Sequence, residues 1–376
     1  MNIGIDIRSL MEEKLTGVGE YTKNLLENLF ALDNKNEYYL FFNSRRDASA
    51  NIPLPPSPNV HLCGFRYPNK LLNYSMKFFN WPRIDTLINK KEKTKIDLFF
   101  FPNVIFFSCS CPYIITAHDL SYDLFPEFLT VAGRIWHKII NPKKLFQNAK
   151  KIIAVSENTR NDLINVFNVS PEKILTQHSG INNAYQKLNS DDQSLSVIKQ
   201  KYNLPEKFIL FLGTIEPRKN VETLIDAFSI FQRKNPDYSL IIAGKTGWKC
   251  RKTLDSIKNN DKIKFISFVE SEDKIYLYNL AKMFVYPSYY EGFGFPPLEA
   301  MACGCPVVMS NNSSLTEIGG EAALFIDPHN LNELAESMHN LTNPDLAQIF
   351  IQKGLKQAKK FSWPETARKY LEKFIN

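Results

Sequence analysis

The order of apolar and polar positions predicts short strands that alternate with helices. In the first half, apolar runs of strand length occur in NIGIDI, EYYLFFN, VHLCGF, DLFFFPN, PYIITAHDL, KIIAVS and EKILTQHSG. Helical spacing places Leu25, Leu29 and Leu32 on one face of YTKNLLENLFAL. Ser156 is a suitable N-cap for a helix over ENTRNDLINVF. Strands separated by helices of this length indicate βαβ units and a parallel sheet.

The pattern lapses and then restarts, which predicts a second domain. Polar residues dominate residues 182–192, the expected linker, and strand-length runs return in FILFLGT, YSLIIAG, IKFISFV, MFVYPS, CPVVMS and ALFIDP. Helices are predicted over NVETLIDAFSIFQRKN and SEDKIYLYNLAK. We expect one domain at residues 1–185, a second domain at 186–358, and a final helix at 359–376, opened by Pro364. Ligands of such sheets bind beyond the carboxyl ends of the strands, here in a cleft between two doubly wound domains.

Composition limits the class of protein. A chain of 376 residues, 44% of them hydrophobic, can bury two cores. The N-terminus lacks a basic segment followed by an apolar run, so we expect no secretory signal and a cytoplasmic location. The charge-poor residues 98–117 contain Pro102, Asn103 and Pro112, which predict two buried strands rather than a membrane-spanning helix. The six cysteines form no CxxC pair and are predicted to be reduced, small core residues.

Basic residues gather in two stretches although the net charge is only +7. The cations of the first stretch are Lys70, Lys77, Arg83, Lys90, Lys91, Lys93 and Lys95, interleaved with Tyr74, Phe78, Phe79 and Trp81. The second stretch runs from Arg134 to Lys151. Such a mixture suits an anionic membrane surface, possible peripheral attachment to the inner face of the cytoplasmic membrane, better than it suits nucleic acid. The alternative is a solvated helix face over core aromatics.

The segment TGVGEYT contains Gly17 and Gly19 ahead of a helix. Their N–H groups could cradle a phosphate at the helix N-terminus, or the glycines could serve a flexible turn with positive φ. A dinucleotide site would need glycines directly after the strand and an acid at the end of the second strand. Here RSLMEEKL intervenes, which argues against a Rossmann oxidoreductase.

Two adjacent cations, Arg218 and Lys219, follow a predicted strand in GTIEPRKN. Arg supplies a planar fork and Lys a point charge, so the pair is suited to a diphosphate. A solvated loop is the alternative interpretation.

Two carboxylates, Glu291 and Glu299, flank the glycines of YYEGFGFPPLEAMACGCPVV. We expect Pro296 and Pro297 to start a helix with Glu299 in its first turn, where the helix dipole favours a carboxylate even without a function. Glu291 precedes Gly292 in a loop whose N–H groups could bind phosphate while the carboxylates accept sugar hydroxyls.

His118, followed by Asp119, ends a predicted buried strand in the first half. It could orient a substrate or assist proton transfer. A packed, hydrogen-bonded histidine is the plainer alternative.

In this order, TGVGEYT, HDL, AVSENTRNDL, GTIEPRKN, EGFGFPPLEAMACGCPVV and FSWPETA resemble the retaining GT-B glycosyltransferases of family 4 (glycosyl transferases group 1). This family includes many bacterial mannosyltransferases of surface-polysaccharide and lipopolysaccharide synthesis. The resemblance implies a GT-B fold and transfer of a hexose from a nucleotide sugar, GDP-mannose being favoured, to a glycan or lipid-linked acceptor. It also implies that residues 1–185 bind the acceptor, that residues 186–358 bind the nucleotide sugar, and that the helix at 359–376 returns to the first domain. Rhamnose, glucose and N-acetylglucosamine donors remain open, as does a sugar-nucleotide epimerase. A glycan phosphorylase would carry a pyridoxal lysine motif that the sequence lacks, and a non-catalytic sugar-binding protein would usually carry an export signal.

The resemblance also implies roles for individual residues. Glu291 would accept hydroxyls of the donor sugar, Glu299 would hold the ribose, Arg218 and Lys219 would clamp the diphosphate, and His118 would lie beside the transferred sugar. The implied donor contacts are Gly17, Gly19, Thr214, Gly292, Phe293, Gly294 and Phe295. Many relatives have Arg where this chain has Thr214, so Arg218 would replace that cation. No metal cofactor is expected, and the sequence has no Asp-x-Asp to hold one.

Overall fold

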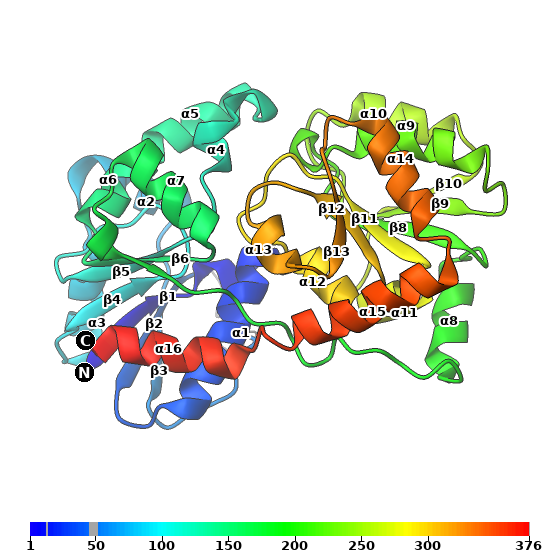
Figure 1. The fold of residues 1–376 in the computed structure, drawn as a ribbon. Helices are drawn as coiled ribbons and strands as arrows, with labels where there is room; N and C mark the ends of the chain where they lie inside the picture. Colours follow the sequence, from blue (N-terminus) through cyan, green and yellow to red (C-terminus); the bar gives the residue numbers. More distant parts are fainter. Residues whose placement is uncertain (13, 45–51, 376) are drawn as a thin grey trace. The chain divides into compact units, whose positions relative to one another are not determined.

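The computed structural model describes all residues except 13, 45–51 and 376, and it forms two compact units, each a parallel sheet with helices on both faces (Figure 1). Unit 1 contains Met1–Leu120, Ala132–Gly180 and Ser362–Asn376. Unit 2 contains Ser121–Val131 and Ile181–Phe361. The predicted class, two doubly wound α/β domains, is confirmed.

Unit 1 has a seven-stranded sheet in the order β3-β2-β1-β4-β5-β6-β7. Its strands are β1 Asn2–Asp6, β2 Glu37–Asn43, β3 Val60–Phe65, β4 Leu98–Phe101, β5 Tyr113–Ala117, β6 Lys151–Ala154 and β7 Ile174–Thr176. Ile5 of β1 pairs with Leu40 of β2 on one side and Phe100 of β4 on the other, and all three side chains are fully buried. Burial on both faces explains why these strands are continuous apolar runs.

The helices of unit 1 are α1 Gly17–Leu32, α2 Asn69–Phe79, α3 Ile84–Glu92, α5 Val131–Ile140, α6 Pro142–Asn148, α7 Glu157–Phe167 and α16 Trp363–Ile375. The short helix α4, Ser121–Leu124, lies in the segment that belongs to unit 2. Strands β2 and β3 and helix α7 have the predicted bounds, and the Ser156 side chain accepts the N–H of Thr159 at 3.0 Å as the predicted N-cap. Helix α1 begins at Gly17 rather than at Tyr21, because Thr16 turns the chain into the helix there.

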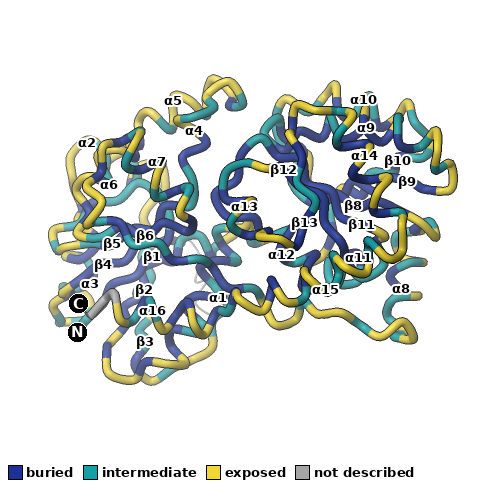
Figure 2. The backbone as a smooth tube through the Cα atoms, in the orientation of Figure 1, coloured by how far each residue is buried: buried dark blue, intermediate teal, exposed yellow. Residues whose placement is uncertain are grey.

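Unit 2 has a six-stranded sheet in the order β10-β9-β8-β11-β12-β13. The strands are β8 Phe208–Leu212, β9 Ser239–Ala243, β10 Ile263–Ile266, β11 Met283–Tyr286, β12 Val307–Ser310 and β13 Ala323–Ile326. The helices are α8 Gln193–Lys201, α9 Val221–Gln232, α10 Arg251–Lys258, α11 Lys274–Leu280, α12 Phe295–Ala302, α13 Leu315–Gly319, α14 Leu331–Asn340 and α15 Pro344–Ala358. The dark tubes in Figure 2 show that the strands of both sheets form the cores.

The C-terminal helix α16 is part of unit 1, where it packs along α1. The phenol groups of Tyr21 and Tyr370 form a buried hydrogen bond between these helices. Thr366 donates its hydroxyl to the His178 carbonyl at 3.0 Å, and a Cβ added at Gly180 would lie 2.1 Å from the Trp363 nitrogen. The chain therefore leaves unit 1 after Gly180 and re-enters it at Ser362, near the expected division at residues 185 and 358.

Residues 98–117 form β4, β5 and the loop between them, as predicted from their prolines. Across the described part of the chain, no helix is both long and apolar enough to cross a membrane.

Candidate active site

The candidate site of unit 2 lies where the direction of chain winding reverses. Strand β8 has β9 on one side and β11 on the other, so the loops after β8 and β11 diverge at the carboxyl edge of the sheet. Such a switch point is where doubly wound sheets bind ligands. The loop after β8 contains Arg218 and Lys219, and the loop after β11 contains Glu291.

The loop after β8 is fixed at both of its ends. At its start, Gly213 donates its N–H to the Ala243 carbonyl at 2.9 Å, and a Cβ at Gly244 (φ 138°) would lie 2.1 Å from the Gly213 oxygen. At its end, Asn220 adopts a left-handed conformation and its side-chain amide donates to the Pro287 and Pro328 carbonyls at 3.1 and 2.8 Å. This backbone holds the two cations in a defined place.

Arg218, Lys219 and Glu291 form one ion cluster. Lys219 Nζ lies 2.6 Å from Glu291 Oε1 and 2.7 Å from the hydroxyl of Tyr286. Arg218 Nη1 donates to Glu291 Oε2 at 2.9 Å, and its Nε and Nη2 donate to Glu216 Oε1 at 3.1 and 2.9 Å. The predicted residues are thus brought together, but Lys219 is only 8% exposed and contacts protein groups.

The loop that contains Glu291 is held by the segment after β12. Glu291 donates its N–H to Ser313 Oγ at 3.0 Å, and Ser314 Oγ donates to the Glu291 and Phe293 carbonyls at 2.9 and 2.7 Å. Gly294, with φ of 118°, then ends the loop in a conformation that favours glycine and precedes α12. The buried side chain of Phe293 packs edge-on against the ring of Phe361, with the ring centroids 5.9 Å apart.

The electrostatics of the cluster keep Glu291 ionised. Burial alone would raise the pKa of Glu291, but the adjacent charges of Arg218 and Lys219 outweigh burial and lower that pKa to about 2. The two cations are balanced by two carboxylates, Glu216 and Glu291. The site therefore holds a permanently charged acceptor, suited to hydroxyl groups, beside guanidinium and ammonium donors suited to phosphate.

Glu299 is hydrogen-bonded to a residue outside this cluster. Its Oε2 accepts the hydroxyl of the buried Tyr278 at 2.9 Å. The expectation that Glu299 falls in the first turn was wrong: α12 begins at Phe295, one residue before the prolines, so Glu299 lies in the second turn. Gly294 allows the earlier start because it supplies the turn into the helix.

Segment Ser121–Val131, which lies between two parts of unit 1 in the sequence, supports the Glu291 loop. The ring of Phe125 lies 5.5 Å from that of Tyr290, and the ring of Phe128 stacks on Tyr289 at 5.6 Å. Trp248 Nε1 donates to the Phe128 carbonyl at 2.6 Å. No motif in the sequence predicted this packing.

The predicted residues of unit 1 occupy the carboxyl edge of its own sheet. Gly17 and Gly19 lie in the first turn of α1, and neither has positive φ, so the turn interpretation was wrong. Space around the Cα of Gly17 is open. His118 Nε2 donates to the Pro102 carbonyl at 2.8 Å, so Nε2 carries a proton, and burial lowers the pKa of the ring, which favours its neutral form. The ring of Tyr21 meets it edge-on at 4.6 Å.

Other site positions show what the sequence could not reveal. Thr214 is half-buried beside Gly247, whose added Cβ would lie 2.9 Å from Thr214 Cγ2. Four further residues hold the charged side chains or the loop of Glu291: Glu216, Tyr286, Ser313 and Ser314. Only Glu216 stands in a recognisable charged motif, GTIEPRKN.

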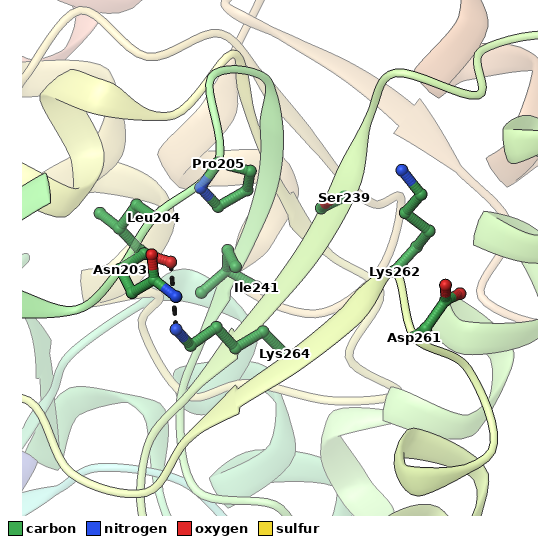
Figure 3. A pocket seen from close by; sticks show the side chains of 8 residues that line it. All are labelled: Asn203, Leu204, Pro205, Ser239, Ile241, Asp261, Lys262 and Lys264. Atoms are coloured by element: carbon green, nitrogen blue, oxygen red, sulfur yellow. Dashed lines mark hydrogen bonds between the residues drawn. The ribbon is translucent and has the colours of Figure 1, made fainter. Parts of the chain in front are cut away.

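A surface hollow in unit 2 is unrelated to this site. It lies at the amino ends of β9 and β10 and is lined by Ser239, Lys262 and Lys264, with Asn203 and Leu204 (Figure 3). Lys264 Nζ donates to the Asn203 carbonyl at 3.0 Å. Parallel sheets bind ligands at the opposite edge, so Lys262 serves below as a control position.

Sequence relatives agree with the geometry. Residues 15–185 match the model of "Glycosyltransferase Family 4", and residues 195–357 match that of "Glycosyl transferases group 1". O-antigen chain mannosyltransferase B of Escherichia coli is 36% identical over 66% of this chain and 66% of its own length. Serotype-specific mannosyltransferase WbdA of Escherichia coli is 34% identical over 61% of this chain and 29% of its own length. The matched part thus spans less than two thirds of these relatives.

Solved structures show the same fold over nearly the whole chain. Sucrose-phosphate synthase from Thermosynechococcus elongatus has a TM-score of 0.77 at 20% identity and covers 99% of this chain and 98% of its own. WaaG, a glycosyltransferase involved in lipopolysaccharide biosynthesis, has a TM-score of 0.72 at 16% identity and covers 98% of both chains. The first half of the chain is thus similar to family 4 and the second half to group 1 of the glycosyltransferases, and the whole chain has the GT-B fold of these solved structures.

Proposed function

We propose that this protein transfers a hexose from a nucleotide sugar to a glycan or lipid-linked glycan in the synthesis of a surface polysaccharide, with retention at the anomeric carbon. The observation that supports this most is the buried, ionised Glu291 held by Arg218 and Lys219 at the switch point of unit 2. The carboxylate of Glu291 can accept hydrogen bonds from the sugar, and the two neighbouring cations can bind the diphosphate.

In this proposal Glu291 accepts hydrogen bonds from the hydroxyl groups of the transferred sugar. Arg218 and Lys219 face the negative charge that grows on the leaving diphosphate, and they are preorganised by Glu216 and Tyr286 before the donor arrives. The backbone N–H groups around Gly292 and Gly294, and those at the start of α12, would contact the phosphates and the sugar of the nucleotide sugar. The cations perform the charge stabilisation, so the reaction is proposed to need no metal.

Further residues would contact other parts of the nucleotide sugar. Glu299, oriented by Tyr278, would accept ribose hydroxyls. In unit 1, the N-terminus of α1 at Gly17 and Gly19 would bind the diphosphate, and neutral His118 would orient the sugar. The leaving phosphate would take the acceptor's proton, because Glu291 with a pKa of about 2 is a poor general base.

GDP-mannose is the favoured donor because relatives of this chain, including one at 36% identity, are named mannosyltransferases. Other nucleotide sugars are alternatives; the solved HepE protein of Anabaena, of similar fold, was crystallised with UDP-glucose. The panel of donors in the assay below distinguishes them.

A membrane-bound acceptor is supported by an exposed aromatic surface on unit 1. Phe79 and Trp81, at the end of α2, are 69% and 68% exposed, so the interpretation as a helix face over core aromatics was wrong for these residues. Helix α5 lies next to α2, with Lys77 Nζ donating to the Ile140 carbonyl at 3.1 Å, and exposes Ile135 and Trp136. Aromatic groups with neighbouring lysines suit the interface of an anionic membrane.

The test is a transfer assay with GDP-mannose, UDP-glucose, UDP-N-acetylglucosamine and dTDP-rhamnose and a lipid-linked glycan acceptor. We expect turnover with one donor, a product that keeps the anomeric configuration of the donor, and no loss on adding a chelator. Sugar interconversion without acceptor would indicate an epimerase, and absence of turnover with every donor would contradict the proposal.

A further inference from the structure

The loop between β4 and β5 brings two thiols to a buried carboxylate in unit 1. Cys109 and Cys111 lie in this loop, and Asp85 lies in the first turn of α3. One ligand atom from each of the three residues lies within 4.8 Å of the others, and the two sulfur atoms are 3.3 Å apart. Among the described residues this is the one such group, and the proposed transfer reaction uses none of its members.

The carboxylate of Asp85 is oriented before any ligand binds. Asp85 is 3% exposed, and its Oδ1 accepts the N–H of Ser110 at 2.9 Å. The hydroxyl of Ser110 donates to Oδ2. Ser110 stands between the two cysteines, so one residue fixes both the carboxylate and the spacing of the thiols. Hydrogen bonds of this kind orient the ligands of metal sites.

We propose that Cys109, Cys111 and Asp85 bind a thiophilic divalent cation of the zinc class. Two thiolates and a carboxylate are three ligands of a tetrahedral site, and water would supply the fourth because both cysteines are partly exposed. Each thiol releases its proton to solvent as its sulfur binds the cation. Sulfur atoms on a tetrahedral zinc are about 3.8 Å apart for bonds of about 2.3 Å, so the loop opens by about half an ångström.

The chemistry of the ligands excludes the commoner hard cations. Magnesium and calcium take oxygen ligands, and only one of these three groups provides oxygen. Soft thiolates select zinc and similar ions.

The cation would fasten the loop to the segment that joins α2 to α3. Ser108, next to Cys109, accepts the N–H of Ile84 at 2.9 Å and donates its hydroxyl to the Asn80 carbonyl at 3.0 Å. Asn80 directly follows α2, the helix with the exposed aromatic groups. Metal binding would therefore make the base of this surface more rigid, separately from the donor site.

The test is a cobalt titration of the full chain in a non-thiol reductant, followed by zinc. We expect a thiolate-to-cobalt absorption band that saturates at about one equivalent per chain and disappears as zinc displaces cobalt. The double variant Cys109→Ser, Cys111→Ser should lose the band, Ser110→Ala should weaken affinity by about tenfold, and Cys250→Ser, at a half-buried cysteine of unit 2, should leave it unchanged.

Amide hydrogen exchange supplies a readout that does not depend on the cobalt absorption band. Zinc should slow exchange of the Ile84 amide in the unmodified chain and not in the double variant. No cobalt band in the reduced protein, or a band that persists in the double variant, would overturn the proposal. A folded double variant is verified by its circular dichroism spectrum.

Discussion

The ammonium nitrogen of Lys219 lies 2.6 Å from Oε1 of Glu291, and both side chains are buried at the carboxyl edge of the unit 2 sheet. A buried pair of this kind is costly to build unless its remaining hydrogen bonds are satisfied. Lys219 donates a second hydrogen bond to the Tyr286 hydroxyl, and Arg218, itself held by Glu216, donates to Glu291. The arrangement fixes a charged acceptor beside two cations, and the predictions below concern what each group does.

Replacing Glu291 by glutamine should lower kcat/KM for transfer by about 10² to 10³ fold, because the neutral amide accepts sugar hydroxyls less strongly and no longer positions Lys219. Lys219→Met should have a similar effect and avoids the larger cavity of alanine. Steady-state transfer rates measure both variants, with Lys262→Ala as the control. Rates equal to that of the control would contradict the site assignment.

Acid should selectively destabilise unit 2 through Glu291. Its folded pKa of about 2 lies below the ordinary value of 4.5, so ionisation stabilises the fold above about pH 5 and this contribution is lost as the pH falls toward 2. The contribution is on the order of 3 kcal/mol at neutral pH. Urea unfolding of the protein and of Glu291→Gln should differ most near about pH 7 and converge only as the pH falls to about 2 or below. A difference that does not change with pH would refute the ionised state.

Tyr278→Phe should weaken donor binding without changing the chemical step. The variant removes the hydroxyl that donates to Glu299 Oε2 at 2.9 Å. Loss of one such hydrogen bond to a charged group costs about 1.5 kcal/mol, so KM for the nucleotide sugar should rise about tenfold at unchanged kcat. A fall in kcat with unchanged KM would place Glu299 at the reacting centre instead.

The aromatic surface of α2 should bind vesicles. The double variant Phe78→Ser, Phe79→Ser removes two exposed rings, which should not affect folding. Binding to anionic vesicles should fall by roughly tenfold or more and weaken with added salt in the unmodified chain. Ile349→Ser, at an exposed apolar residue of α15 in unit 2, is the matched control. Equal binding of all three proteins in a co-sedimentation assay would reject this surface.

Local patterns predicted the fold well where a segment's own residues decide its structure. Strands β2 and β3 and helix α7 were predicted to their end residues, because apolar runs and the Ser156 cap are local signals. Helix α12 begins earlier than its prolines suggested, since the turn depends on Gly294.

The candidate site was predicted only in part, for a related reason. Arg218, Lys219 and Glu291 stand in recognisable motifs, but the ion pairs among them depend on the packing of β8 against β11. Exposure of Phe79 and Trp81 was also undecided in the sequence, because an amphipathic pattern defines a face and not whether another element covers it.

Calorimetric binding of GDP-mannose, with UDP-glucose and the other nucleotide sugars as comparisons, tests the central claim most directly. We predict that one nucleotide sugar binds the unmodified protein and Lys262→Ala equally, and that Glu291→Gln and Lys219→Met bind it at least about tenfold more weakly while remaining folded. Equal affinity in all four proteins would contradict the account, because the donor would then bind outside the cluster of Arg218, Lys219 and Glu291.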